Sequence, residues 1–184
     1  MERIDAMKAF LCETVDDFVL DDFVGERLYK MQDGFGKELE KTVRKMAVHK
    51  TEGIVSISYL RSSIVTGSHE FYIAYYKDEL FVEEEPEAVY LGMEQLFQGT
   101  ESDCVEIFQI LGKKFIRFLA SEKEEIRRWY IWLLYERLGT LAGKSFEKTS
   151  EAGGIPVFYG GYMEEQHQLG VVNNENEILS DHGR

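Results

Sequence analysis

The chain has 184 residues, of which 44% are hydrophobic and 30% charged, and its 21 Lys and Arg against 34 Asp and Glu give a formal net charge of −13. This balance excludes the disordered, collagen-like and disulfide-scaffold classes. It predicts one globular domain over residues 1–175 and a flexible C-terminal tail over 176–184. Because the chain is strongly acidic, it is poorly suited to neutralising phosphates. We therefore expect neither nucleic acid nor a membrane as its partner.

The expected compartment is the cytoplasm. No stretch approaches the roughly 20 consecutive apolar residues of a membrane span, and the N-terminus lacks the cationic and apolar blocks of an export signal. The two cysteines, Cys12 and Cys104, form no CxxC motif and lie beside apolar residues in helix-like segments. We therefore expect both to be buried, reduced thiols.

Two helices are predicted at the N-terminus. Apolar residues three to four positions apart run from Ile4 to Phe18, and a second such stripe runs from Val24 to Met46. Asp21 or Asp22 is expected to cap the second helix. Because a glycine costs about 1 kcal/mol inside a helix, residues 34 and 36 predict a bend or break near 33–36.

From Gly53 the apolar period changes to two, which is typical of strands. The pattern predicts strands near Val55–Tyr59, at Glu70–Tyr76 and at Leu80–Val82, paired as a three-stranded antiparallel meander. The middle one is central because it is apolar on both faces. Between the first two the phase slips over residues 60–63, which suggests a β-bulge, and the glutamate-rich run after residue 82 suggests a solvated loop.

The second half of the chain is predicted to be mainly helical. A short helix is expected over Tyr90–Phe97, then a long helical region over 103–143. The sequence leaves open whether that region is one helix or two, because Ser121 and Glu124 match a capping box. A C-terminal hairpin of Gly153–Tyr162 with Gln168–Val172 completes an α+β fold whose helices pack on one face of the sheet.

Two surfaces are candidates for binding a partner. Residues 51–104 carry a net charge of −9, whereas residues 105–148 carry +3. On a helical wheel the cations of the second segment gather opposite its apolar stripe. They form a predicted basic face of Lys113, Lys114, Arg117, Lys123, Arg127 and Arg128.

The other candidate is an aromatic sheet face. The strands carry many tyrosines, and tyrosine combines apolar area with a hydroxyl that tolerates water. Tyr59, Tyr72 and Tyr75 are the candidates there, together with Arg61, one of only two basic residues in 51–104.

No spacing in the sequence points to a catalytic, cofactor or metal site. The four histidines form no HxxxH or HExxH pattern, and no G-x-S-x-G or phosphate-binding glycine motif occurs. We therefore expect a non-enzymatic protein-interaction domain, of the adaptor, chaperone-like or immunity-like kind, that binds a protein partner or a second copy of itself. The alternative is a hydrolase-like or small-ligand-binding enzyme with a cleft between sheet and long helix, using His69, Arg61 and a carboxylate such as Glu70.

Overall fold

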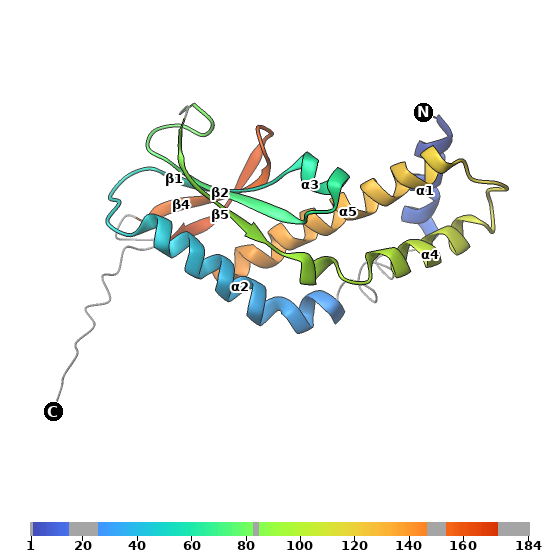
Figure 1. Cartoon of the computed structure of the whole chain (residues 1–184), viewed down its shortest axis with the longest axis horizontal. Helices are drawn as coiled ribbons and strands as arrows, with labels where there is room; N and C mark the ends of the chain where they lie inside the picture. The colour runs from blue at the N-terminus through green and yellow to red at the C-terminus, as the bar shows by residue number, and fades with distance from the viewer. Residues whose placement is uncertain (1, 15–25, 83–84, 147–153, 173–184) are drawn as a thin grey trace.

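The computed structural model describes residues 2–14, 26–82, 85–146 and 154–172, and these residues form an α+β fold (Figure 1). The elements, in chain order, are α1 (Glu2–Thr14), α2 (Glu26–Ala47), β1 (Ile54–Tyr59), α3 (Arg61–Thr66), β2 (Glu70–Tyr76), β3 (Glu87–Gly92), the 3₁₀ turn η2 (Glu94–Phe97), α4 (Thr100–Leu111), α5 (Ala120–Ala142), the 3₁₀ turn η3 (Gly143–Ser145), β4 (Ile155–Gly161) and β5 (Gln166–Val172).

The two N-terminal helices are confirmed, but the break expected in the second one is wrong. α2 continues through both glycines without interruption. Its buried stripe includes Phe35, Leu39 and Val43, and each such side chain contributes about 1.5–3 kcal/mol on burial. That gain exceeds the cost of the two glycines. The expected Asp21 or Asp22 cap and the predicted tail lie outside the described residues.

The described strands form one mixed sheet in the order β3-β2-β1-β4-β5. β1 pairs antiparallel with β2 and parallel with β4, so Ile57 lies opposite both Ile73 and Tyr159. The predicted C-terminal hairpin is confirmed as β4 and β5. That this hairpin continues the sheet beside β1 was not predicted.

The meander is confirmed in topology, but its third strand was placed at the wrong residues. β3 is Glu87–Gly92, within the region expected to be loop and short helix. The segment predicted as a strand instead turns back at Phe81, whose φ is +64°, and the Phe81 ring contacts Tyr76 5.5 Å away. Of the short helix expected over Tyr90–Phe97, only Glu94–Phe97 is helical, and it forms a 3₁₀ turn.

The β-bulge expected over residues 60–63 is also wrong, because residues 61–66 form α3. Gly67 ends this helix in the left-handed conformation and donates its N–H to the Ser63 carbonyl, 2.8 Å away. Glycine adopts that conformation without steric cost, which favours this helix end.

The long helical region consists of two helices, α4 and α5, joined by the α4–α5 loop (residues 112–119). The predicted capping pair was two residues late. Leu119 occupies the N-cap position, and its N–H donates to the Glu122 carboxylate at 2.8 Å. A single helical wheel therefore does not describe the region.

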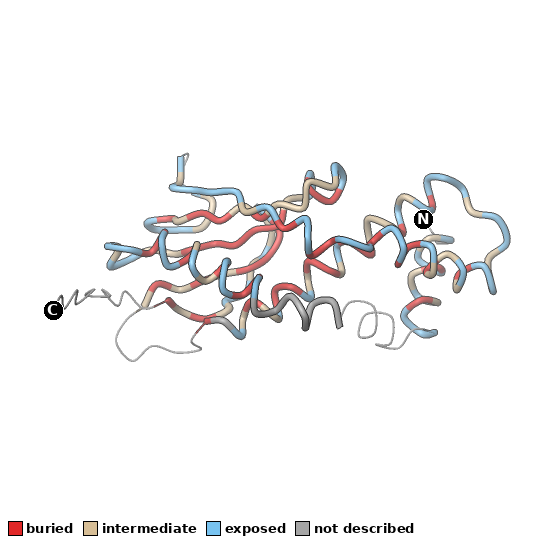
Figure 2. The backbone as a smooth tube through the Cα atoms, turned by 60° about the horizontal axis from the view of Figure 1, so that its bottom comes forward, coloured by how far each residue is buried: buried red, intermediate tan, exposed pale blue. Residues whose placement is uncertain are grey.

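The main core lies between the sheet and the helices α2 and α5 (Figures 1 and 2). Ile57, Ile73 and Tyr159 face these helices and are fully buried. Of the two cysteines expected to be buried, Cys104 is buried and Cys12 is exposed, so the expectation for Cys12 is wrong. Burial raises the pKa of the Cys104 thiol to about 11.

Candidate interaction surfaces

The sheet face away from α2 and α5 carries a connected set of aromatic rings, which we call the outer aromatic face: Tyr72, Tyr76, Phe81, Tyr90 and Tyr162. Tyr72 lies opposite Tyr90 in the β2–β3 register. Its ring lies 5.3 Å from the rings of Tyr90 and Tyr162, and Phe81 connects Tyr162 to Tyr76 at 5.4 and 5.5 Å. Rings at these separations and tilts attract one another through their edges and faces.

Part of this face is covered and part is open. Ser56 and Ser58 of β1 are buried beneath the Gln166 side chain of β5. The Ser56 hydroxyl donates to the amide oxygen of Gln166 at 2.9 Å, and the amide nitrogen of Gln166 donates to the Ser58 hydroxyl at 2.8 Å. Tyr90, in contrast, is 60% exposed, and Tyr162 is 38% exposed. The open part therefore presents tyrosine rings to solvent along β3 and the β4–β5 turn.

The other two candidate tyrosines lie on the opposite, helix-facing side of the sheet. Tyr59 is buried; its hydroxyl donates to Glu136 at 2.7 Å and accepts from the Trp132 indole at 3.1 Å, and burial raises its pKa. Tyr75 donates to the Glu52 carbonyl at 2.8 Å, and the Lys50 ammonium lies 4.7 Å from the centre of its ring. The structure therefore separates Tyr72 from both.

A groove of about 390 Å³ lies between α3 and α5, where the alternative hypothesis expected a cleft. Arg61 lines it, but its side chain is 84% exposed and is paired with Glu164 at 2.6 Å. Other lining residues include Trp129, Trp132 and Arg128. His69 and Glu70 do not line this groove, so the structure separates the residues that the enzyme hypothesis combined.

His69 instead stacks on Phe97, with ring centres 4.1 Å apart and planes within 4°. Its Nδ1 is buried and has no hydrogen-bond partner among the described residues. Burial, and then the positive charge of Arg127, lower the pKa of this imidazole. The neutral form of the His69 ring is therefore favoured, and in this form the ring stacks on Phe97.

The predicted basic face does not form one surface. Arg127 pairs with Glu101 of α4 at 2.7 Å, and Arg128 pairs with Glu124 at 3.0 Å. The Lys123 ammonium lies 5.6 Å from the centre of the Phe108 ring. Lys113, Lys114 and Arg117 lie together on the α4–α5 loop, apart from these α5 residues.

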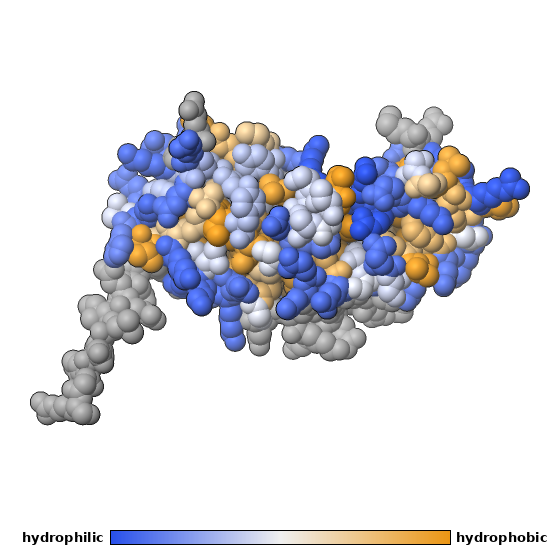
Figure 3. Space-filling view, in the orientation of Figure 1, coloured by the Kyte–Doolittle hydropathy of each residue, from blue (hydrophilic) through white to orange (hydrophobic). Residues whose placement is uncertain are grey.

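This loop combines exposed cations with exposed aliphatic side chains. Ile116 is 85% exposed and Leu119 is 63% exposed. The loop lies at one end of the long axis, where hydrophobic and hydrophilic residues are interspersed (Figures 1 and 3). The sequence did not reveal this feature, because the exposure of Leu119 depends on where α4 ends and α5 begins.

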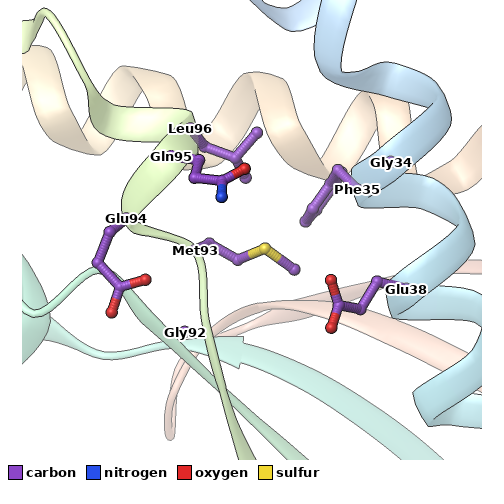
Figure 4. Close-up of a pocket in the computed structure, with 8 residues that line it drawn as sticks. All are labelled: Gly34, Phe35, Glu38, Gly92, Met93, Glu94, Gln95 and Leu96. Atoms are coloured by element: carbon purple, nitrogen blue, oxygen red, sulfur yellow. The ribbon is translucent and has the colours of Figure 1, made fainter.

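A second cavity, of about 350 Å³, lies between α2 and the β3–η2 connection. Phe35, Met93 and Leu96 supply its apolar lining, and Glu38 and Glu94, which are exposed, line it as well. In Figure 4 the Met93 side chain points toward α2, between Phe35 and Glu38. We call this the acidic cavity.

Comparisons with protein-family models, curated proteins and solved structures found no match. Among the described residues, no group of three or more His, Cys, Asp or Glu side chains is placed to hold a metal ion. None of the described helices is both long and apolar enough to cross a membrane.

Proposed function

We propose that the protein is a cytoplasmic, non-enzymatic interaction domain that binds a protein partner through the outer aromatic face. The observation that carries this proposal is the set of contacting rings around Tyr72, Tyr90 and Tyr162, of which Tyr90 is 60% exposed. Exposed tyrosines in contact with one another form a rigid apolar surface with hydroxyl groups at its edge, and tyrosine is enriched where protein interfaces gain most of their binding energy.

The charge around this face indicates the chemistry of the partner. The β2–β3 connection carries exposed Asp78, Glu79 and Glu85, and the β4–β5 turn adds Glu165. Residues 51–104 have a net charge of −9. Because complementary potentials guide association and discriminate against wrong partners, we propose a partner that presents basic residues around an apolar or aromatic centre, and not a nucleic acid.

Site-specific photo-crosslinking in cells that make the protein tests this proposal. A benzophenone amino acid replaces Tyr90 in one variant and Tyr162 in another, so that an aromatic group is retained. The matched control carries the same group at Val105 of α4, which is 57% exposed and lies away from the outer face. We expect both outer positions to form adducts with the same protein, and the adduct site to lie in a basic segment.

The proposal is wrong if the two outer positions give no protein adduct, or if the control position gives the same adducts in equal yield. Binding strength gives an independent readout once the partner is known. Tyr90→Thr retains a residue suited to a strand, and loss of a central interface tyrosine costs about 1–2 kcal/mol or more. We therefore expect the dissociation constant to rise by roughly tenfold.

A further inference from the structure

The α4–α5 loop is held in a fixed shape that directs aliphatic side chains outward. Phe115 and Phe118 pack inward, with ring centres 5.9 Å from Phe10 and 5.8 Å from Phe108. The residues next to them in the chain, Ile116 and Leu119, are the exposed ones. Inward anchors thus alternate with outward aliphatic residues.

The backbone of this loop is fixed from α1. The Arg3 guanidinium donates to the carbonyls of Ile116 and Arg117 at 3.3 and 2.6 Å and pairs with Glu122 at 3.4 Å. A surface that is already ordered loses little conformational entropy on binding. The exposed Ile116 is therefore presented as a preformed apolar contact.

Within the loop itself, the charged residues are all positive. Lys113, Lys114 and Arg117 lie within residues 112–119, and this segment contains no Asp or Glu. Lys114 lies 4.6 Å from the centre of the Phe10 ring, which leaves Lys113 and Arg117 as exposed cations on either side of Ile116. We call Lys113, Ile116 and Arg117 the tip of this loop. The tip is an apolar side chain flanked by positive charge.

The acidic cavity has the complementary character, because it is lined by the apolar Phe35, Met93 and Leu96 and by the exposed carboxylates of Glu38 and Glu94. Its volume of about 350 Å³ lies within the range of ligand pockets, and it is large enough for an aliphatic side chain. In one molecule the tip lies at the end of the long axis, whereas η2, beside the cavity, lies near the middle (Figure 1). The tip therefore does not lie beside the cavity of its own chain.

We propose that the protein self-associates, with Ile116 of one copy seated in the acidic cavity of a second copy and Lys113 and Arg117 beside Glu38 and Glu94. This contact is distinct from the outer aromatic face, so it goes beyond the proposed function. If it forms twice in reciprocal fashion it closes a dimer, and otherwise it extends a chain. The net charge of −13 opposes association at long range, but physiological salt screens charges beyond about 8 Å and spares close pairs more.

Sedimentation equilibrium at physiological salt, from about 1 to 200 µM protein, covers the range expected for a weak contact. The tip variant is Lys113→Glu/Arg117→Glu, and the cavity variant is Glu38→Lys/Glu94→Lys. The control, Lys45→Glu/Lys144→Glu, changes net charge by the same amount as the tip variant at exposed lysines outside both surfaces. Ile116→Ser is compared with Val105→Ser, since both residues are exposed aliphatics.

We expect the wild type and both controls to self-associate. The tip, cavity and Ile116→Ser variants should each associate at least about tenfold more weakly, as for other truncated interface anchors. An equimolar mixture of the tip and cavity variants should regain association, because the exchanged charges again attract. Circular dichroism of each variant confirms that it is folded.

The proposal is overturned if the wild type stays monomeric over this range, or if the mixture fails to regain association. It is also overturned if the monomeric wild type binds phosphatidylserine vesicles but not phosphatidylcholine vesicles through Ile116, because the tip would then serve a membrane surface. Crosslinking from Tyr90 in the tip variant separates this result from the proposed function, since that crosslinking should not change.

Discussion

At the residue scale, the closest approach between helix and sheet depends on a glycine. A Cβ added at Gly139 of α5 would lie 2.5 Å from the Tyr159 ring of β4. Tyr159 is fully buried, and its hydroxyl donates to the Tyr135 carbonyl. Because the ring is held at both ends, it cannot move away from a larger neighbour. Gly139 thus sets the distance at which α5 packs on the sheet.

We therefore expect Gly139→Ala to lower the free energy of unfolding by about 1–3 kcal/mol, the usual cost of overpacking, although alanine favours helices. Gly143→Ala is the control, because its added Cβ would meet Leu169 at 3.5 Å, an ordinary contact, and should change stability by no more than about 0.5 kcal/mol. Urea unfolding measures both. Equal stability of the two variants would contradict the packing argument.

The buried face of His69 makes stability depend on pH. Its pKa is lowered from 6.5 by burial and by the charge of Arg127, so the unfolded chain binds a proton at a higher pH than the folded one. Stability therefore falls as the pH decreases through 6.5, and the loss levels off below the folded pKa. The contribution of the neutral ring is fully present above 6.5.

Urea unfolding at about pH 7.5 and pH 5.5, on either side of the reference histidine pKa, measures this effect. His69→Asn removes the titrating group and suits the φ of +49° at this position. We expect this variant to lose less stability than the wild type between the two pH values. His49→Asn, at an exposed residue with a φ of +63°, should behave as the wild type does, and an identical loss in all three proteins would refute the assignment.

At the element scale, α1 acts as a brace for the α4–α5 loop. Its contacts with that region include the three made by Arg3, the Phe10–Phe115 ring contact, the Lys114 ammonium over the Phe10 ring and the Lys8–Glu125 pair at 3.5 Å. The first helix of the chain thus determines the shape of a loop more than 100 residues later.

Arg3→Met should free the loop backbone without unfolding the molecule. Hydrogen bonds to charged groups contribute about 1.5–3 kcal/mol, so amide exchange within residues 113–119 should accelerate roughly tenfold or more, as measured by mass spectrometry. Lys8→Met is the matched control on the same helix and should leave exchange in the loop nearly unchanged. Equal acceleration in both variants would mean that α1 acts as a whole and not through Arg3.

The elements that the sequence predicted well are those whose pattern and local chemistry agree. The alternation of Val55, Ile57 and Tyr59 predicted β1, the run that is apolar on both faces predicted β2, and a short aromatic segment followed by Gln168–Val172 predicted the hairpin β4–β5. β3 was missed because its residues are mostly exposed, so no alternation marks them. α3 was missed because its helix end depends on Gly67, whose left-handed conformation periodicity does not reveal.

At the scale of the whole molecule, the uneven distribution of charge was readable from the sequence, but its arrangement was not. The +3 segment was predicted to form one face, yet Arg127 pairs with Glu101 and Arg128 with Glu124, so two of the three α5 cations of that face are neutralised. What remains is Lys123 over the Phe108 ring and the cations of the α4–α5 loop, whose position depends on where α4 ends. The candidate tyrosines were divided between two sheet faces for a similar reason, since a strand alternates sides at every residue.

The parallel pairing of β1 with β4 has a consequence for how the chain is made. Val55 of the central strand β1 pairs with Val157 of β4. One edge of β1 therefore stays unpaired until β4 has been synthesised, about a hundred residues later. Contacts this distant in sequence slow folding, and an unpaired strand edge recruits other chains. A nascent or prematurely ended polypeptide that stops before residue 155 retains that open edge, and is the species most exposed to aggregation.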